Sequence, residues 1–172
     1  MFFNRVLMSR HYIIFMVLSI ILAGCSGNIQ RGPLDVKKVT YVEYGGDTNH
    51  VEMYVITSDH KVTQYSINPD KNYDYLAGEL PPEDYYELKE YEMSEMSWTS
   101  MVNVLTRVNF MELKEDLSAG GDICDASSFY IKVETSDANH SSGGYAAGLI
   151  DDSIGRRFAE ARQSIMKALD GN

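Results

Sequence analysis

Three strand-like segments follow one another early in the chain, and only short connections separate them. Residues 36–44 are rich in Val, Thr and Tyr and end at the turn signal Gly45-Gly46-Asp47. Residues 51–58 and 62–67 have the same character, with the tight connection Asp59-His60-Lys61 between them. Because parallel neighbours require a crossover of about a dozen residues or more, the three segments are predicted to form an antiparallel meander.

Two amphipathic helices are expected farther along the chain. The first helix is expected over residues 97–108. Ser97 is a suitable N-cap for it, and Asn109 is a suitable residue at its end. Residues 154–169 form the second, which follows the capping run Asp151-Asp152-Ser153 and stops before Gly171. In the first helix, residues 97–108, the apolar side chains recur at helical spacing and share one face: Trp98, Met101, Val102, Leu105 and Val108.

Two more strands are expected between these helices. Residues 127–134 alternate, so that Phe129, Ile131 and Val133 share one face of a half-buried strand. Residues 141–149 are its expected hairpin partner. The order of three strands, helix, two strands and helix predicts an α+β fold, with an antiparallel sheet of about five strands and two main helices packed on one face.

The beginning of the chain has the layout of a secretory signal. Arg5 and Arg10 give it a positive start, and residues 12–22 form an apolar run too short to remain as a membrane-spanning helix. The run ends in Leu22-Ala23-Gly24-Cys25, which resembles the lipobox of bacterial lipoproteins. An ordinary secretory signal with an incidental cysteine and a short buried helix are the alternatives.

The resemblance implies that Cys25 becomes the lipid attachment site. Its thiol receives a diacylglyceryl group, and the chain is then cut before Cys25. The new amino group is a further site for acylation. Labelled palmitate would therefore be incorporated at Cys25. The expected organisation is a signal peptide over residues 1–24, a lipidated tether over 25–34 and a single α+β globular domain over 35–172. Met8 is an alternative start to Met1.

The same resemblance implies a location in the bacterial cell envelope. The acyl chains on Cys25 would hold the protein on a membrane, with its domain facing the periplasm or the exterior. In Gram-negative bacteria, Asp after the lipidated cysteine tends to retain lipoproteins at the inner membrane. Ser26 stands there instead, which favours the outer membrane if the host is Gram-negative.

Charge and cysteine content limit the classes of function. The signal peptide contains Arg5 and Arg10 but no acid, so its removal changes the net charge from −10 to −12. Such a charge disfavours nucleic acid and anionic lipid surfaces as partners. Cys124 is the only other cysteine, so a lipidated Cys25 leaves it without a disulfide partner in the chain. The loop 120–125 lacks the ligand spacing of a zinc or calcium site, and neither a metal nor a cofactor is expected.

An acidic segment rich in tyrosine precedes the first helix. Between Glu79 and Glu95 there are seven acids and one base, Lys89, and we call these residues the acidic Tyr segment. It is compatible with a short helix that starts at Glu83 after two prolines, and equally with an extended edge. One interpretation is a surface that docks a basic protein partner; the other is a solvated excursion whose tyrosines cover one edge of the core. The candidate partner-binding residues are Glu83, Asp84, Tyr85, Tyr86 and Glu87.

No sequence motif identifies an enzyme. The chain has no G-x-S-x-G, P-loop or H-E-x-x-H pattern, and the sequence nominates no catalytic residue. These observations favour a non-catalytic, protein-binding envelope lipoprotein of the inhibitor, immunity or assembly-factor type, or a structural accessory of an outer-membrane complex. A small-ligand-binding or hydrolytic envelope module is the alternative, since a pair of carboxylates can still assemble in space.

Overall fold

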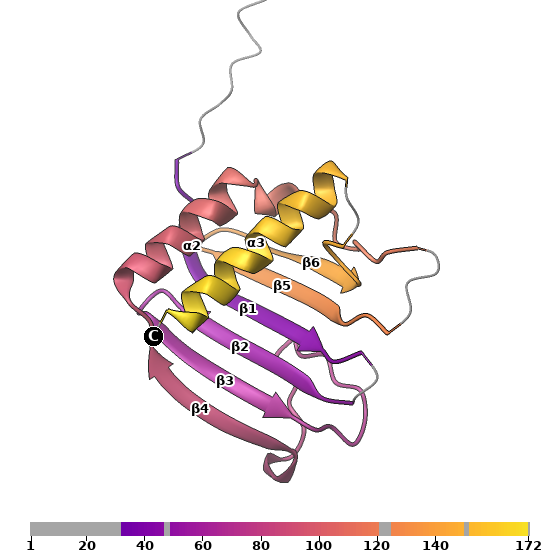
Figure 1. The fold of residues 1–172 in the computed structure, drawn as a ribbon. Coiled ribbons are helices and arrows are strands. Elements are labelled where there is room, and N and C mark those ends of the chain that lie inside the picture. Colours follow the sequence, from indigo (N-terminus) through magenta and orange to yellow (C-terminus); the bar gives the residue numbers. More distant parts are fainter. Residues whose placement is uncertain (1–31, 47–48, 121–124, 150–151, 172) are drawn as a thin grey trace, which may run out of the picture. The chain divides into compact units, whose positions relative to one another are not determined.

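One antiparallel sheet and two helices make up the domain (Figure 1). The computed structural model describes residues 32–46, 49–120, 125–149 and 152–171. Within them the sheet has six strands in the order β4-β3-β2-β1-β5-β6, and all neighbours are antiparallel. The elements are β1 (Val36–Tyr44), β2 (Val51–Thr57), β3 (Lys61–Ile67), η1 (Glu83–Tyr85), β4 (Tyr86–Glu92), α2 (Glu95–Arg107), η2 (Phe110–Glu112), β5 (Ser128–Thr135), β6 (Asn139–Tyr145) and α3 (Ser153–Asp170).

The predicted α+β class is confirmed, with both helices on the same face of the sheet (Figure 1). The sheet has six strands because the acidic Tyr segment supplies one. After Pro82, whose backbone is extended, the chain makes a single 3₁₀ turn in η1 and then runs as β4 beside β3. Both of the alternatives expected for this segment are therefore present, one after the other.

Helix α2 begins two residues earlier than predicted. Ser94, not Ser97, is its N-cap, and the backbone N–H of Ser97 donates to the Ser94 side chain over 3.1 Å. Ser97 is therefore inside the first turn, where its amide needs the cap that Ser94 provides. The other predicted cap is confirmed, since the Asp152 carboxylate accepts from Gly155 N–H at the start of α3.

The main core lies between the helices and the sheet. It takes alternate residues of the strands, among them Val39 and Tyr41 of β1 and Phe129, Ile131 and Val133 of β5. The buried face of α2 contributes Met101, Val102 and Leu105 as predicted, while Trp98 packs partly buried at its margin. Helix α3 adds its own stripe of Phe158, Ala161, Ile165, Ala168 and Leu169.

A smaller core covers the opposite face of the sheet. Its buried members are Val42, Val51, Met53, Ile67 and Tyr75, so the connection between β3 and β4 folds back over the strands. Lys132 fastens this connection from β5, with its Nζ donating to the Leu76 carbonyl over 2.9 Å. The sheet is therefore covered on both faces, by helices on one and by a tyrosine-rich loop on the other.

The two edges of the sheet differ. Residues 115–119 lie against the outer edge of β6, where Leu117 N–H donates to the Gly143 carbonyl over 2.8 Å and Gly143 N–H donates to the Glu115 carbonyl over 3.0 Å. No segment within the described residues pairs with the outer side of β4. Four consecutive residues of this seven-residue strand, residues 87–90, are exposed. Strand β4 is thus the bare edge of the sheet (Figure 1).

Candidate functional site

The five candidate partner-binding residues are consecutive and lie where η1 passes into β4. Glu83, Asp84 and Glu87 are exposed, and Tyr85 exposes 39% of its surface. Tyr86 is half-buried, and its ring meets that of Tyr65 edge-to-face at a centroid distance of 5.5 Å. The two tyrosines therefore differ: Tyr85 offers its ring to solvent, whereas Tyr86 helps to hold β4 on β3.

A hollow of about 610 Å³ adjoins these residues. The pairing of Ile67 with Tyr86 and of Ser66 with Glu87 brings the end of β3 against the start of β4. His50, which precedes β2, also lines the hollow. Its lining consists of His50, Ser66, Asn68, Asp84, Tyr85, Tyr86 and Glu87.

Carboxylates continue from this hollow across the sheet. The strand register places Glu43 opposite Glu52, Glu52 opposite Ser66, and Ser66 opposite Glu87. Directly paired residues point to the same face of a sheet, and neighbouring strands are about 4.8 Å apart. Glu43, Glu52, Ser66 and Glu87 therefore form one row over four strands, which we call the acidic row. The acidic row lies on the helix-bearing face. Tyr41 is two positions from Glu43 and Ile56 is four positions from Glu52, so each pair shares a face of the sheet. Both Tyr41 and Ile56 belong to the core beneath the helices.

Glu52 is the fixed charge at the centre of the acidic row. Ser66 donates a short hydrogen bond to its carboxylate, His50 Nε2 lies 2.7 Å from Oε1, and Gln64 Nε2 donates to Oε2 over 3.2 Å. Partial burial raises the pKa of Glu52, but the three polar neighbours outweigh burial, and the pKa is lowered overall. Glu52 is therefore ionised at neutral pH.

Arg162 of α3 holds the other end of the acidic row. Its Nε donates to the Tyr41 hydroxyl over 3.2 Å, and Tyr41 donates in turn to Glu43 over 2.8 Å. The guanidinium carbon lies 3.5 Å above the centre of the Phe129 ring. Arg157, also on α3, donates to the carbonyls of Val108 and Asn109. These two arginines are thus bound to β1, β5 and the end of α2 rather than to the acidic Tyr segment.

The paired carboxylates do not favour hydrolysis. A general acid needs a raised pKa so that it still holds its proton near neutral pH. Glu52 has the opposite shift. The described residues also contain no group of three His, Cys, Asp or Glu that could hold a metal ion.

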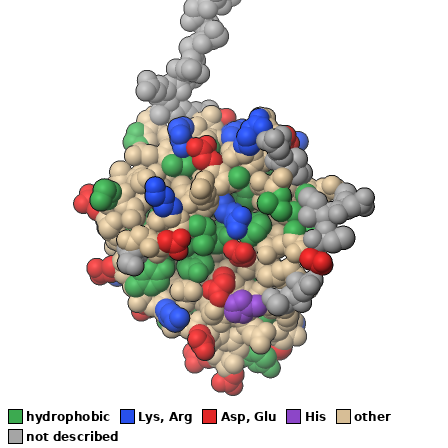
Figure 2. Space-filling model, in the orientation of Figure 1, with side chains coloured by type: hydrophobic (Ala, Val, Ile, Leu, Met, Phe, Trp, Pro, Cys, Tyr) green, Lys and Arg blue, Asp and Glu red, His purple; other side chains and the backbone are tan. Residues whose placement is uncertain are grey.

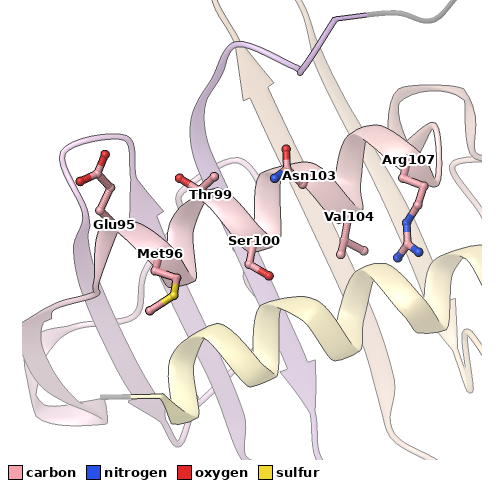
Figure 3. Close-up of a pocket in the computed structure, with 7 residues that line it drawn as sticks. All are labelled: Glu95, Met96, Thr99, Ser100, Asn103, Val104 and Arg107. Carbon is pink, nitrogen blue, oxygen red and sulfur yellow. The ribbon is translucent and has the colours of Figure 1, made fainter.

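A second hollow, of about 640 Å³, follows the outer side of α2 (Figure 3). Glu95 and Arg107 stand at its opposite ends, about 18 Å apart at 1.5 Å per helical residue. Arg107 is paired with Glu160 of α3, and Met96, Ser100 and Val104 line the side towards α3. Because its charged groups do not converge, this hollow has no arrangement that would orient a small polar ligand.

The charge on the helix-bearing face is unevenly distributed. Acidic side chains gather over the lower strands, whereas most basic side chains lie in the upper half of this view (Figure 2). Sequence patterns identified the residues of η1 and β4, but they missed His50, Glu52 and Ser66. Only the strand register brings those three beside β4. The one local signal that could have found Glu52 is its position between Val51 and Met53, since adjacent strand residues face opposite sides.

The lipobox, including Cys25, and also Cys124 lie outside the described residues. Within those residues, no helix combines the length and apolar character needed to cross a membrane. No protein-family model matches the chain, and a search of curated proteins found no match either.

Proposed function

We propose that the protein is a lipid-anchored envelope lipoprotein that binds a basic protein partner without catalysing a reaction. The observation behind this proposal is the bare edge of β4 beside the acidic row and the exposed residues of η1. Every carboxylate of this surface that meets solvent adds to one local negative field. Such a field steers a basic partner and increases its association rate.

Tyr85 is the proposed anchor within this surface. Tyrosine is enriched among the residues that dominate binding energy, because it offers rigid contact area together with a polar hydroxyl. Tyr85 is exposed and lies between Asp84 and Glu87 in the lining of the hollow. Arg162 pairs with Glu43 at the far end of the acidic row, and Arg157 donates to backbone carbonyls. Neither arginine therefore neutralises the acids of η1 and β4 from within the domain.

The lipid anchor limits where the partner is found. A tether of ten residues, from Cys25 to Leu34, reaches about 35 Å at full extension. A domain on such a tether stays close to the membrane that holds Cys25. We therefore propose a partner that is itself in the membrane or lies close to its surface.

Photo-crosslinking in the native host tests this function. A photo-reactive amino acid in place of Tyr85 should capture one predominant partner, and the same residue in place of Asn103 on α2 should not. The triple variant Glu83→Gln, Asp84→Asn, Glu87→Gln, carrying the probe at position 85, should reduce capture several-fold. Its matched control is Glu115→Gln, Asp125→Asn, Asp137→Asn, which removes the same charge from exposed positions outside the site.

Two results would contradict the proposed function. One is equal capture from positions 85 and 103, which would mean that contact at Tyr85 is not specific. The other is equal loss of capture in both triple variants, which would mean that only the total charge matters. Captured protein should also have a basic surface, and its yield should fall above about 0.1 M salt, where the Debye length is about 10 Å.

A further inference from the structure

The backbone of β4 has an outward-facing row of hydrogen-bonding groups. Asn68 N–H donates to the Tyr85 carbonyl and Met93 N–H to the His60 carbonyl, each over 2.8 Å. Both bonds belong to the β3–β4 register, in which hydrogen-bonded pairs alternate with unbonded pairs. The intervening odd-numbered residues, Glu87, Lys89 and Tyr91, therefore bond to β3. The N–H and carbonyl groups of Tyr86, Leu88, Glu90 and Glu92 point away from β3, to the bare edge.

These outward groups are a template for another strand. An extended chain that pairs with a sheet edge gains main-chain hydrogen bonds, and alternate side chains then determine specificity. The fold covers the β6 edge with residues 115–119 and leaves no such cover on β4 among the described residues. Strand β4 is seven residues long, which is within the usual length of strands that pair in a sheet.

Charge decides between the possible occupants. A second copy of β4 would bring Glu87, Glu90 and Glu92 of each strand together against a single Lys89 per strand, and like charges on an edge oppose such pairing. A basic segment meets the same acids with attraction. The β4 side chains on the face opposite the helices further define this basic segment. Leu88, which is 47% exposed, is followed on that face by Glu90 and Glu92. A complementary strand carries an apolar residue beside Leu88 and basic residues beside the two glutamates.

We propose that β4 receives an extended basic segment of the partner as a seventh strand of the sheet. This inference rests on the proposed function and specifies the form in which the partner binds. The partner's main chain pairs with Tyr86, Leu88, Glu90 and Glu92. Its basic side chains lie against Glu90 and Glu92, and its apolar side chain lies against Leu88.

Synthetic peptides provide the probe. Two seven-residue peptides have threonine at every other position, beginning with the first. At the three positions between, one peptide carries valine and then two lysines, and the other carries two lysines and then valine. The two peptides thus represent both strand directions. A third peptide has glutamate in place of lysine. Each is added to the full chain purified in detergent, and amide hydrogen exchange along β4 is followed residue by residue.

Strand addition predicts an alternating pattern of exchange. The amides of Leu88 and Glu90 should exchange about tenfold more slowly with a lysine peptide at ten times its Kd. The amides of Lys89 and Tyr91 should change little, because they already bond to β3. Uniform protection, or peptide binding with no protection of the outward amides, would overturn strand addition and leave the proposed function standing. Failure of both lysine peptides to bind at millimolar concentration, or equal binding of the glutamate peptide, would also overturn it.

A backbone variant gives an independent test. Glu90→Pro removes an outward N–H without removing a bond to β3, and proline is tolerated on a strand edge in this orientation. It should weaken lysine-peptide binding by about tenfold, because a main-chain hydrogen bond and the Glu90 charge are both lost. Glu90→Gln, which keeps the N–H and removes the charge, should weaken binding by about two- to threefold. Equal binding by the two variants, each with a cooperative melting curve, would overturn the inference.

Discussion

At the residue scale, Glu52 links the acidic row to the pH dependence of stability. Its folded-state pKa lies below the ordinary value of 4.5, because the hydrogen bonds from its polar neighbours outweigh burial. The stabilisation is complete at pH above that ordinary value. It is lost as the pH falls through the lower, folded-state pKa, where protonation of the carboxylate removes the preference for the folded state.

Glu52→Gln should therefore flatten the acid limb of the stability curve. Between about pH 5 and pH 3, the free energy of unfolding should fall less steeply in this variant than in the parent protein. Urea unfolding at several pH values measures the difference. Glu115→Gln, at an exposed position, is the control for loss of one carboxylate. Parallel curves for Glu52→Gln and the parent would refute this account of the Glu52 hydrogen bonds.

The two adjacent tyrosines should separate binding from stability. Tyr86→Ala removes a half-buried ring that meets Tyr65, and it should cost about 2 kcal/mol of stability. For a domain of this size, that loss lowers Tm by roughly 4–8 °C. Tyr85→Ala should change stability by less than about 0.5 kcal/mol, yet it should accelerate dissociation of the partner. Calorimetry and a binding curve on both variants decide the matter. A large drop in Tm for Tyr85→Ala would identify that ring as structural.

At the scale of elements, the local pattern predicted most strands within one residue of their bounds. The alternation in residues 127–134 and the short turns between the first three strands are local signals, and the structure confirms them. The predicted N-cap of α2 was wrong. Ser94 and Ser97 are both serines, they are three residues apart, and either is a suitable N-cap by residue type. The choice between them depends on where the chain leaves β4, which no local pattern contains.

Strand β4 was ambiguous for a physical reason. Pro81 and Pro82 followed by acids are typical of a helix start, while the residues after them alternate as in a strand. Pairing with β3 decides in favour of the strand, and this is a tertiary interaction. The acidic row was unpredictable for the same reason, since Glu43, Glu52 and Glu87 become neighbours only through the register of four strands.

At the scale of the whole molecule, edge protection and charge act together. One edge of the sheet is closed by the chain itself, and the other edge carries acids that repel a second copy of the protein. The closed edge needs no charge, because its hydrogen bonds are already made to residues 115–119. In the proposed mode of binding, the same acids that oppose pairing with a second copy attract a basic strand.

The last prediction concerns how the whole molecule is held at a membrane. Cys25→Ser should abolish incorporation of labelled palmitate and leave the leader uncleaved, because only the cysteine sulfur offers the nucleophile that accepts the diacylglyceryl group. The variant should then lose the two or three acyl chains that stable anchoring requires, since one chain anchors only marginally. Cys124→Ser is the matched control: it removes the other thiol of the chain and should keep full labelling.

Labelling in the native host, followed by mass determination of the mature N-terminus, measures both outcomes. Full labelling of Cys25→Ser, or loss of label in Cys124→Ser, would contradict attachment at Cys25. On the proposed function, a lipid on Cys25 would keep the domain within about 35 Å of the membrane, and a partner at that surface would meet the β4 edge at a high local concentration. Cys25→Ser should therefore also reduce crosslinking from position 85, whereas the isolated peptides should bind β4 equally in both proteins. Under this proposal, the anchor would act on encounter and the strand edge on recognition.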